Sequence, residues 1–291
     1  MNTPDTLQRF VFEQAPVRGE IVHLDATWRA VLDRHDYPPV LRDLLGEMMA
    51  AAALLSATLK FSGSLIMQMQ GTGPVKLLVV ECNSDMTLRA TANWEGELVS
   101  PLLHDLLGGG RFAITIDPQQ GGQSYQGIVD LEGDSVAEVL QNYMTRSEQL
   151  DTRLWLAADA GHAAGMLLQR LPGNAHEDDE AWNRAQILGG TVTRGELLAL
   201  PALEMVRRLY HEEDVRLFES SPVSFRCSCS RERVTGMLRM LGYDEVKSVV
   251  LEQGSVEVDC EFCNRHFGFD AVDVEQIFAA EVMTPAPSAR H

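Results

Sequence analysis

Four cysteines near the C-terminus form two close pairs, Cys227 with Cys229 and Cys260 with Cys263, and thirty residues separate the pairs. Four thiolates presented from two turns can close a tetrahedron around Zn²⁺. Each pair could also close on itself as a disulfide, because residues two or three apart can bring their Cα atoms to about 5.5–6 Å. The spacing therefore leaves open a permanently reduced structural zinc site, a metal site that doubles as a thiol switch, and two neighbouring disulfides.

Two further residues could take part in this chemistry. Cys82 ends an apolar run, so we interpret it as a small buried side chain. His266 lies three residues after Cys263 and could replace a thiolate on the metal. Because four cysteines already fill a tetrahedron, the predicted ligands are the four paired cysteines.

Composition narrows the class of protein. The chain has 291 residues, is 45% hydrophobic and carries a net charge of −18 with a pI near 4.8. Such acidity repels a phosphate backbone and argues against a nucleic-acid partner. The most apolar helical stretch contains Arg42, Asp43 and Glu47, which predicts a buried helix and not a membrane span. With five cysteines and no recognisable signal peptide, we expect a cytoplasmic protein and not a secreted disulfide scaffold.

The N-terminal two-thirds predicts an α+β core domain, residues 1–173, rich in antiparallel sheet with packed helices. Pro38-Pro39 opens a helix whose apolar residues are too dense for a surface helix. Alternating apolar residues and turn residues then predict a meander. A capping box at Ser135 to Glu138 opens a second helix. The predicted strands lie near residues 65–70, 75–80, 86–94, 112–116, 124–131, 152–158 and 164–169.

This core shows no catalytic constellation in its sequence. Gly71-Thr72-Gly73 and Gly108-Gly109-Gly110 lack the strand-to-helix context of a phosphate-binding loop. A nucleophile elbow and a zinc-protease helix are also missing from the sequence. We therefore expect a protein that is not an enzyme.

Residues 174–226 have the character of a helical linker. Apolar residues come in short bursts, interrupted by Gly189-Gly190, Gly195 and Pro201. Each predicted helix is below the ~12–15 residues at which an isolated helix is even marginal in water, so its order must come from packing. We expect the linker to dock on the meander around Leu65, Met67, Met69 and residues 77–79. It is either an ordinary docked linker or a segment that loosens when its neighbour does.

The last segment, residues 227–291, is predicted to be a small metal-dependent domain. Ser230 can cap a helix that Gly242 ends, Asp244 can start a second helix, and strands are expected at 256–258 and 267–269. So small a unit with few large apolar residues is not comfortable alone. Metal binding supplies roughly 10–16 kcal/mol of folding free energy in small zinc peptides, so loss of the ion should unfold it.

Taken together, these features resemble the heat shock protein 33 family of redox-regulated chaperones, over nearly the whole chain. The cysteine pairs with their spacer carry the resemblance, together with several core motifs. These motifs are Arg9-Phe10, Val17-Arg18-Gly19-Glu20, Gly73-Pro74-Val75, Val79-Val80-Glu81-Cys82, Ser84-Asp85-Met86-Thr87-Leu88-Arg89-Ala90, Tyr125-Gln126-Gly127-Ile128-Val129 and Ser147-Glu148-Gln149-Leu150 with Thr152.

The resemblance implies a core, a metastable linker and a zinc-binding redox switch. It implies that the reduced chain is inactive and holds one Zn²⁺ on Cys227, Cys229, Cys260 and Cys263. It also implies that on oxidation disulfides Cys227–Cys229 and Cys260–Cys263 form, zinc leaves and the linker unfolds. A chain of this family would then dimerise and bind unfolding client proteins without ATP under oxidative stress.

Two other classes remain open. A thiol-disulfide oxidoreductase would use Cys260 and Cys263, although that motif usually lies beside a βαβ pattern. A constitutive zinc-ribbon module would bind protein, since the net charge of −18 disfavours nucleic acid. Neither class requires the metastable linker.

Overall fold

The computed structural model describes residues 5–118, 122–172 and 178–282. It divides the chain into two compact units, residues 1–226 and 227–291. Residues 174–226, which we treated as a linker, belong to the first of these units. In the described residues, no helix is both long enough and apolar enough to cross a bilayer.

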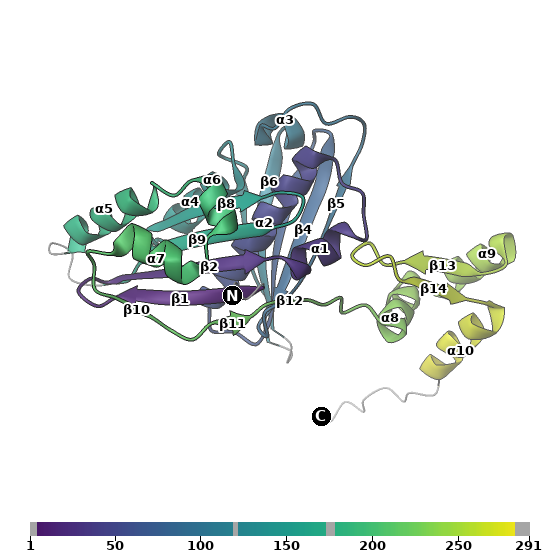
Figure 1. Cartoon of the computed structure of the whole chain (residues 1–291). Coiled ribbons are helices and arrows are strands. Elements are labelled where there is room, and N and C mark those ends of the chain that lie inside the picture. The colour runs from purple at the N-terminus through teal and green to yellow at the C-terminus, as the bar shows by residue number, and fades with distance from the viewer. Residues whose placement is uncertain (1–4, 119–121, 173–177, 283–291) are drawn as a thin grey trace, which may run out of the picture. The chain divides into compact units, whose positions relative to one another are not determined.

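The first sheet of the larger unit has the strand order β10-β1-β2-β9-β8, and β11 also pairs with β1 (Figure 1). All of its strand pairs are antiparallel. The ring of Phe10 lies over Gly19 on the neighbouring strand, where a Cβ would come within 2.1 Å of the ring. The strands are β1 (Thr6–Phe12), β2 (Val17–Leu24), β8 (Thr152–Ala158), β9 (Ala163–Arg170), β10 (Val215–Leu217) and β11 (Ser221–Pro222).

The second sheet contains the predicted meander, in the order β12-β5-β4-β3-β6-β7. Alternating side chains of its first meander strand, Leu65, Met67 and Met69, are fully buried, as period-two patterning requires. The strands are β3 (Gly63–Gly71), β4 (Val75–Asn83), β5 (Thr87–Trp94), β6 (Gly110–Pro118), β7 (Tyr125–Asp130) and β12 (Ser224–Phe225). The predicted meander and the strands after it are confirmed.

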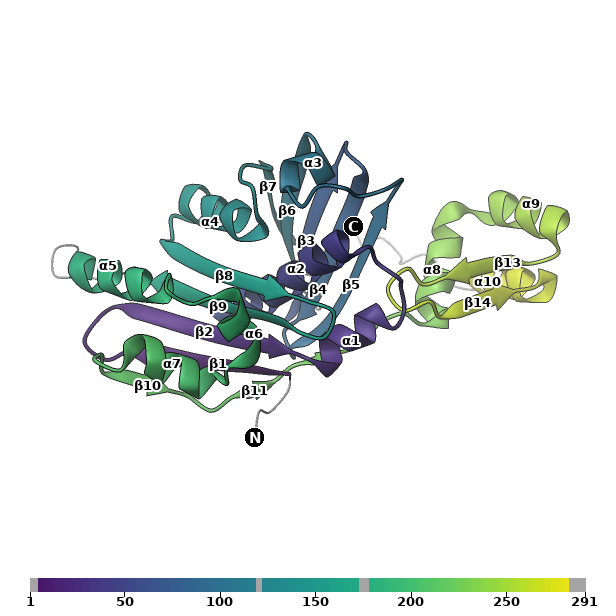
Figure 2. The same cartoon turned by 45° about the horizontal axis from the view of Figure 1, so that its top comes forward.

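Helix α2 (Pro39–Thr58) lies between the two sheets (Figure 2). Thirteen of its twenty residues are buried, because both sides of the helix face strands. The helix approaches β8 so closely that a Cβ on Gly46 would lie 2.5 Å from the Cβ of Ala158. The prediction of a buried helix is confirmed.

The other core helices are α1 (Ala26–Leu32), α3 (Leu103–Leu107) and α4 (Val136–Arg146). The predicted cap of α4 forms only in part. The hydroxyl of Ser135 accepts from the backbone N–H of Glu138, but the carboxylate of Glu138 accepts from Asp134 and not from the cap residue.

Three short helices cover the face of the first sheet that points away from α2 (Figure 1). They are α5 (Asp178–Gly189), α6 (Arg194–Ala199) and α7 (Ala202–Tyr210). Our prediction that they dock on the meander is wrong. Leu65, Met67 and Met69 pack in the core cluster that contains α2, so that face is already covered.

The chain after α7 adds strands to both sheets. β10 and β11 pair with β1, and β12 pairs in parallel with β5, the edge of the second sheet. Val223, between β11 and β12, is buried in the main core. The sequence analysis did not predict these strands, the hairpin β1–β2 or α1.

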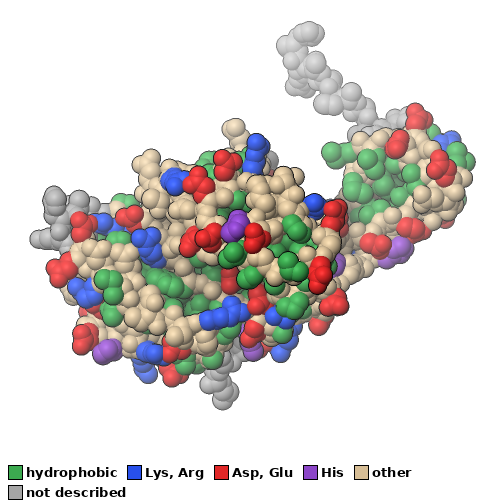
Figure 3. All heavy atoms as spheres, turned by 90° about the horizontal axis from the view of Figure 1, so that it is seen from above, with side chains coloured by type: hydrophobic (Ala, Val, Ile, Leu, Met, Phe, Trp, Pro, Cys, Tyr) green, Lys and Arg blue, Asp and Glu red, His purple; other side chains and the backbone are tan. Residues whose placement is uncertain are grey.

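The smaller unit is built from α8 (Arg231–Leu241), α9 (Tyr243–Gln253), the hairpin β13 (Val256–Asp259) and β14 (His266–Phe269), and α10 (Ala271–Val282). The caps Ser230 and Gly242 and both strands are confirmed, while α10 was not predicted. Its core is small, and apolar side chains gather on its surface (Figure 3). Among its described residues, Met240, Leu251 and Val272 are the most exposed large apolar side chains.

Candidate metal and redox centre

The second cysteine pair lies in the turn between β13 and β14. The carbonyl of Cys260 accepts backbone N–H bonds from Cys263 at 3.1 Å and from Asn264 at 2.7 Å. Asn264 has a φ of 56°, the left-handed conformation that asparagine tolerates better than most residues. This tight turn directs both thiols of the pair to one side.

The first cysteine pair lies between β12 and α8. Ser230 ends this connection as the N-cap of α8, with its hydroxyl accepting from the backbone N–H of Arg233. The side chain of Arg233 donates to the hydroxyl of Ser228, the residue between Cys227 and Cys229, at 2.6 Å. Cap and side-chain bond together fix the turn that carries the two thiols.

The structure brings the four predicted ligands together. All four sulfur atoms lie within 4.8 Å of one another, with Sγ of Cys227 3.6 Å from Sγ of Cys260 and Sγ of Cys229 3.3 Å from Sγ of Cys263. Zn–S bonds of about 2.3 Å in a tetrahedron place sulfurs about 3.8 Å apart. The residues present therefore fit a four-thiolate zinc site.

The surroundings of two of the thiols disfavour their charged form. Burial, followed by hydrogen bonds from neighbouring thiols, raises the pKa of Cys229, and burial also raises the pKa of Cys260. A bound divalent cation reverses this balance, because it deprotonates the thiols that coordinate it. Burial therefore favours the neutral thiol at Cys229 and Cys260, whereas coordination to a metal would favour the thiolate.

Cys82 and His266 lie outside the sulfur cluster. Cys82 is fully buried on β4, and burial raises the pKa of its thiol to about 12. The imidazole of His266 lies between two carboxylates, with Nδ1 2.8 Å from Asp259 and Nε2 2.7 Å from Glu257. The carboxylates raise the pKa of His266, and this ring is not part of the thiol cluster.

Upstream of the cluster, the linker helices bury an apolar interface against the first sheet. Tyr210 of α7 stacks edge-on against Phe12, with ring centroids 5.0 Å apart, and lies 6.0 Å from the ring of Phe10. Trp182, Leu197 and Met205 are each at least 95% buried in the same cluster. The sheet contributes Phe10, Phe12, Val17, Ile21, Ala157, Ala164, Met166 and Leu168.

Comparisons with known proteins agree with this architecture. The sequence model of the Hsp33 protein family matches residues 5–270. The chain is 53% identical to the 33 kDa chaperonin of Methylobacillus flagellatus over the full length of both. It is 56% identical to the 33 kDa chaperonin of Chromobacterium violaceum, covering 100% of this chain and 99% of that protein. The chain belongs to the Hsp33 family.

A solved structure shares the Hsp33 fold. The 33 kDa chaperonin (heat shock protein 33 homolog) of Thermotoga maritima superposes with a TM-score of 0.83, covers 96% of this chain and is 21% identical in sequence. Membership of the Hsp33 family assigns a chaperone role to the chain. Its cysteine cluster fits zinc binding and redox-sensitive cysteines.

Sequence reasoning missed several residues that hold the linker of this Hsp33-family chain. A complete capping box joins Thr193 and Glu196 at the start of α6, and its Thr-x-x-Glu pattern was visible in the sequence. His23 of β2 contacts the carbonyl of Leu197 through Nε2 at 3.1 Å, which no local pattern reveals. The contact of His23 joins segments 174 residues apart.

Proposed function

We propose that the chain is a redox-regulated, ATP-independent holdase that binds unfolding proteins in the bacterial cytoplasm under oxidative stress. One observation carries the proposal. Four thiols with the geometry of a zinc site begin directly after a linker that covers an apolar sheet face. We divide the chain by function into a core (1–173), a linker (174–226) and a switch (227–291).

In the reduced state, Cys227, Cys229, Cys260 and Cys263 would hold one Zn²⁺ per chain. The donor set supports this assignment, since four sulfurs lie within 4.8 Å of one another. When bound, the ion would crosslink α8, β13 and β14 and keep the sulfurs as thiolates. Thiolates are the form that an oxidant attacks.

Oxidation would join Cys227 to Cys229 and Cys260 to Cys263. Each bond takes two electrons from two thiolates, and a peroxide that accepts them with two protons leaves as two waters. Within the folded unit, the cross-pair contacts of 3.6 and 3.3 Å are also short. Once the metal leaves and the unit unfolds, only the members of a pair stay close, because one or two residues separate them.

Unfolding of the switch would loosen the linker, because the two segments are joined directly in the chain. The segment after α7, which pairs with the two sheets through β10, β11 and β12, ends at Arg226, directly before Cys227. The three linker helices are 12, 6 and 9 residues long, too short to persist unpacked. Their release uncovers the apolar face of the first sheet for client segments, and we propose that the open form dimerises.

Light scattering of a heat-denatured client tests the proposal. The oxidised chain should suppress aggregation without ATP, whereas the reduced, zinc-loaded chain should not. Peptide mapping of the oxidised chain should show both within-pair disulfides and a free Cys82. Suppression in both states would favour a constitutive binding module, and insulin reduction would favour an oxidoreductase. A dominant peptide that joins 227–229 to 260–263 would overturn the pairing.

A further inference from the structure

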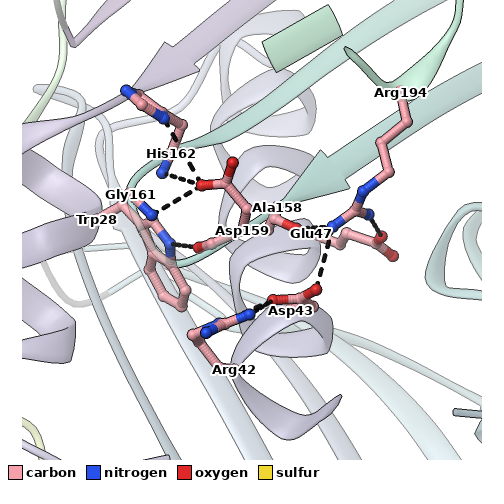
Figure 4. A network of polar contacts seen from close by, with 9 residues as sticks. All are labelled: Trp28, Arg42, Asp43, Glu47, Ala158, Asp159, Gly161, His162 and Arg194. Carbon is pink, nitrogen blue, oxygen red and sulfur yellow. Dashed lines mark hydrogen bonds and ion pairs between the residues drawn. The ribbon is translucent and has the colours of Figure 1, made fainter. Parts of the chain in front are cut away.

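Helix α6 is anchored to the core by one cation in an acidic site (Figure 4). Nη2 of Arg194 lies 3.0 Å from Oδ2 of Asp43, and Nη1 lies 3.7 Å from Oε1 of Glu47. The same guanidinium donates to the backbone carbonyl of Ala158 at the end of β8. Arg194 therefore contacts a side-chain pair on α2 and a strand end at once.

The two carboxylates form a site that needs a cation from outside the core. Asp43 and Glu47 lie four residues apart on α2, the spacing at which like charges repel on a helix. Asp43 has a second cation, since Nε of Arg42 donates to it at 2.8 Å. Glu47 has only a 22% exposed side chain, and burial raises its pKa to about 7 while Arg194 opposes that shift. Arg194 is thus the main compensation for Glu47 while the linker is docked.

The linker also contacts an apolar surface, which begins one helical turn after Arg194. Leu197, three residues after Arg194, is 2% exposed and packs in the cluster with Ile21 and Met166. On α7, the apolar side chains of Met205, Val206, Leu209 and Tyr210 continue along the same face. The docked linker therefore presents a cation first and large apolar side chains after it.

We propose that the surface contacted by the linker, made of the acidic pair on α2 and the apolar face of the first sheet, selects client segments that resemble the linker: an arginine or lysine followed, about three residues later, by large apolar residues. Asp43 and Glu47 are its specificity-determining residues. This inference rests on the proposed function, in which the linker leaves and clients take its place. A cation at the acidic pair restores the compensation that Arg194 gave, whereas an acidic client residue brings a third like charge to it.

Peptides from the linker itself test the site. A fluorescent peptide of residues 192–211 is titrated with the oxidised full chain, and anisotropy reports binding. Replacing Arg194→Ala in the peptide should weaken binding about fivefold, in the range of two partly exposed ion pairs. The matched control is Arg207→Ala, which removes the same charge from an exposed position of α7. That peptide should bind like the parent.

Variants of the chain complete a double-mutant cycle. In an Asp43→Asn/Glu47→Gln chain, the parent and the Arg194→Ala peptides should bind equally. An Asp36→Asn/Glu97→Gln chain has the same net charge, but its substitutions lie at exposed positions outside the site, so it should keep the fivefold difference. High salt should reduce that difference, because it screens partly exposed pairs.

The same titrations on a reduced Met205→Asp chain separate two kinds of failure. This substitution should displace the linker without oxidation, while Asp43, Glu47 and the sheet keep their own side chains. If oxidised chain does not suppress client aggregation but the Met205→Asp chain discriminates the peptides, the redox function fails and the site stands. Equal binding of the Arg194→Ala and parent peptides, or no binding of any peptide to either chain, overturns the site.

Discussion

At the scale of residues, four thiols carry the proposed switch and a fifth is excluded from it. The cluster thiols are half-buried and adjacent to one another, while Cys82 is fully buried among apolar side chains. Reactivity of a thiol follows its thiolate fraction and its access to solvent. Cysteine therefore has two roles in this chain, which are set by the burial and the neighbours of each side chain.

Replacing any one cluster cysteine should abolish stoichiometric zinc binding. A Cys→Ser change at Cys227, Cys229, Cys260 or Cys263 removes one of four soft ligands, so the metal content should fall from one per chain to near zero. Cys82→Ser is the control and should keep the metal. Elemental analysis of protein purified with reductant measures this. Zinc retained in the cluster variants, or missing from the parent chain, would contradict the assignment.

His23 should make linker docking sensitive to acid. Burial lowers the pKa of His23 in the docked state, whereas the ordinary value of 6.5 applies once α6 leaves. The undocked state therefore binds a proton first as the pH falls through 6.5. Each further unit of pH weakens docking by up to about 1.4 kcal/mol, until the docked imidazole also titrates.

Hydrogen exchange of residues 180–210 in the reduced chain, corrected for intrinsic rates, measures this effect between pH 7.5 and 5.5. His23→Gln is the control, because it lacks the titration but leaves Glu47, whose own protonation acts on the same helix. An acid-induced rise that is equal in both chains would assign the effect to another group.

At the scale of elements, α7 is amphipathic, so substitutions on its buried and exposed sides should have different effects on linker docking. Met205 is 1% exposed against the first sheet, whereas Leu203 on the same helix is 47% exposed. The helix owes its order to the buried side because nine residues cannot hold a helix alone. The packing of α7 on the first sheet should therefore decide whether the linker stays docked.

The change Met205→Asp should release the linker from the first sheet while zinc is bound. Burying an unpaired carboxylate costs at least a few kcal/mol, so the helix should leave the sheet. The reduced variant should suppress client aggregation, with faster exchange in residues 180–210 and unchanged protection in 40–170. Leu203→Asp is the matched control and should stay inactive when reduced. If the Met205→Asp chain has a loosened linker, keeps zinc and still binds no client, linker docking does not control client binding.

At the scale of the whole molecule, the two units differ in what stabilises them. The larger unit has a core in which α2 is packed between two sheets, whereas the core of the smaller one contains eight buried apolar residues among those that the structure describes. A metal contributes roughly 10–16 kcal/mol to folding in small zinc domains, which exceeds what so small a core supplies. Stability should therefore be divided unequally between the units.

Zinc removal should unfold the smaller unit and spare the core. A strong chelator added to the reduced chain should raise exchange throughout residues 227–282, followed by residues 180–226, while 40–170 stay protected. Zinc returned with reductant should restore protection. A chelated chain whose smaller unit keeps its protection would show that the four thiols do not hold the unit together.

The sequence alone determined the features that rest on local pattern. Cysteine spacing predicted the thiol cluster, dense apolar periodicity predicted the buried helix α2, and alternation predicted the meander, because each signal lies within a few residues of chain. The short linker helices were also predicted, although Gly195 lies inside α6 and does not end it.

Tertiary structure alone decided which surfaces meet. The linker docks on the first sheet and not on the meander, because α2 packs against the meander face on which we expected the linker to dock. Strands β10 to β12 are two or three residues long and take their order from pairing with β1 and β5. Arg194 meets Asp43 across 151 residues of sequence. Such contacts depend on packing between distant segments, which no local period in a single sequence encodes.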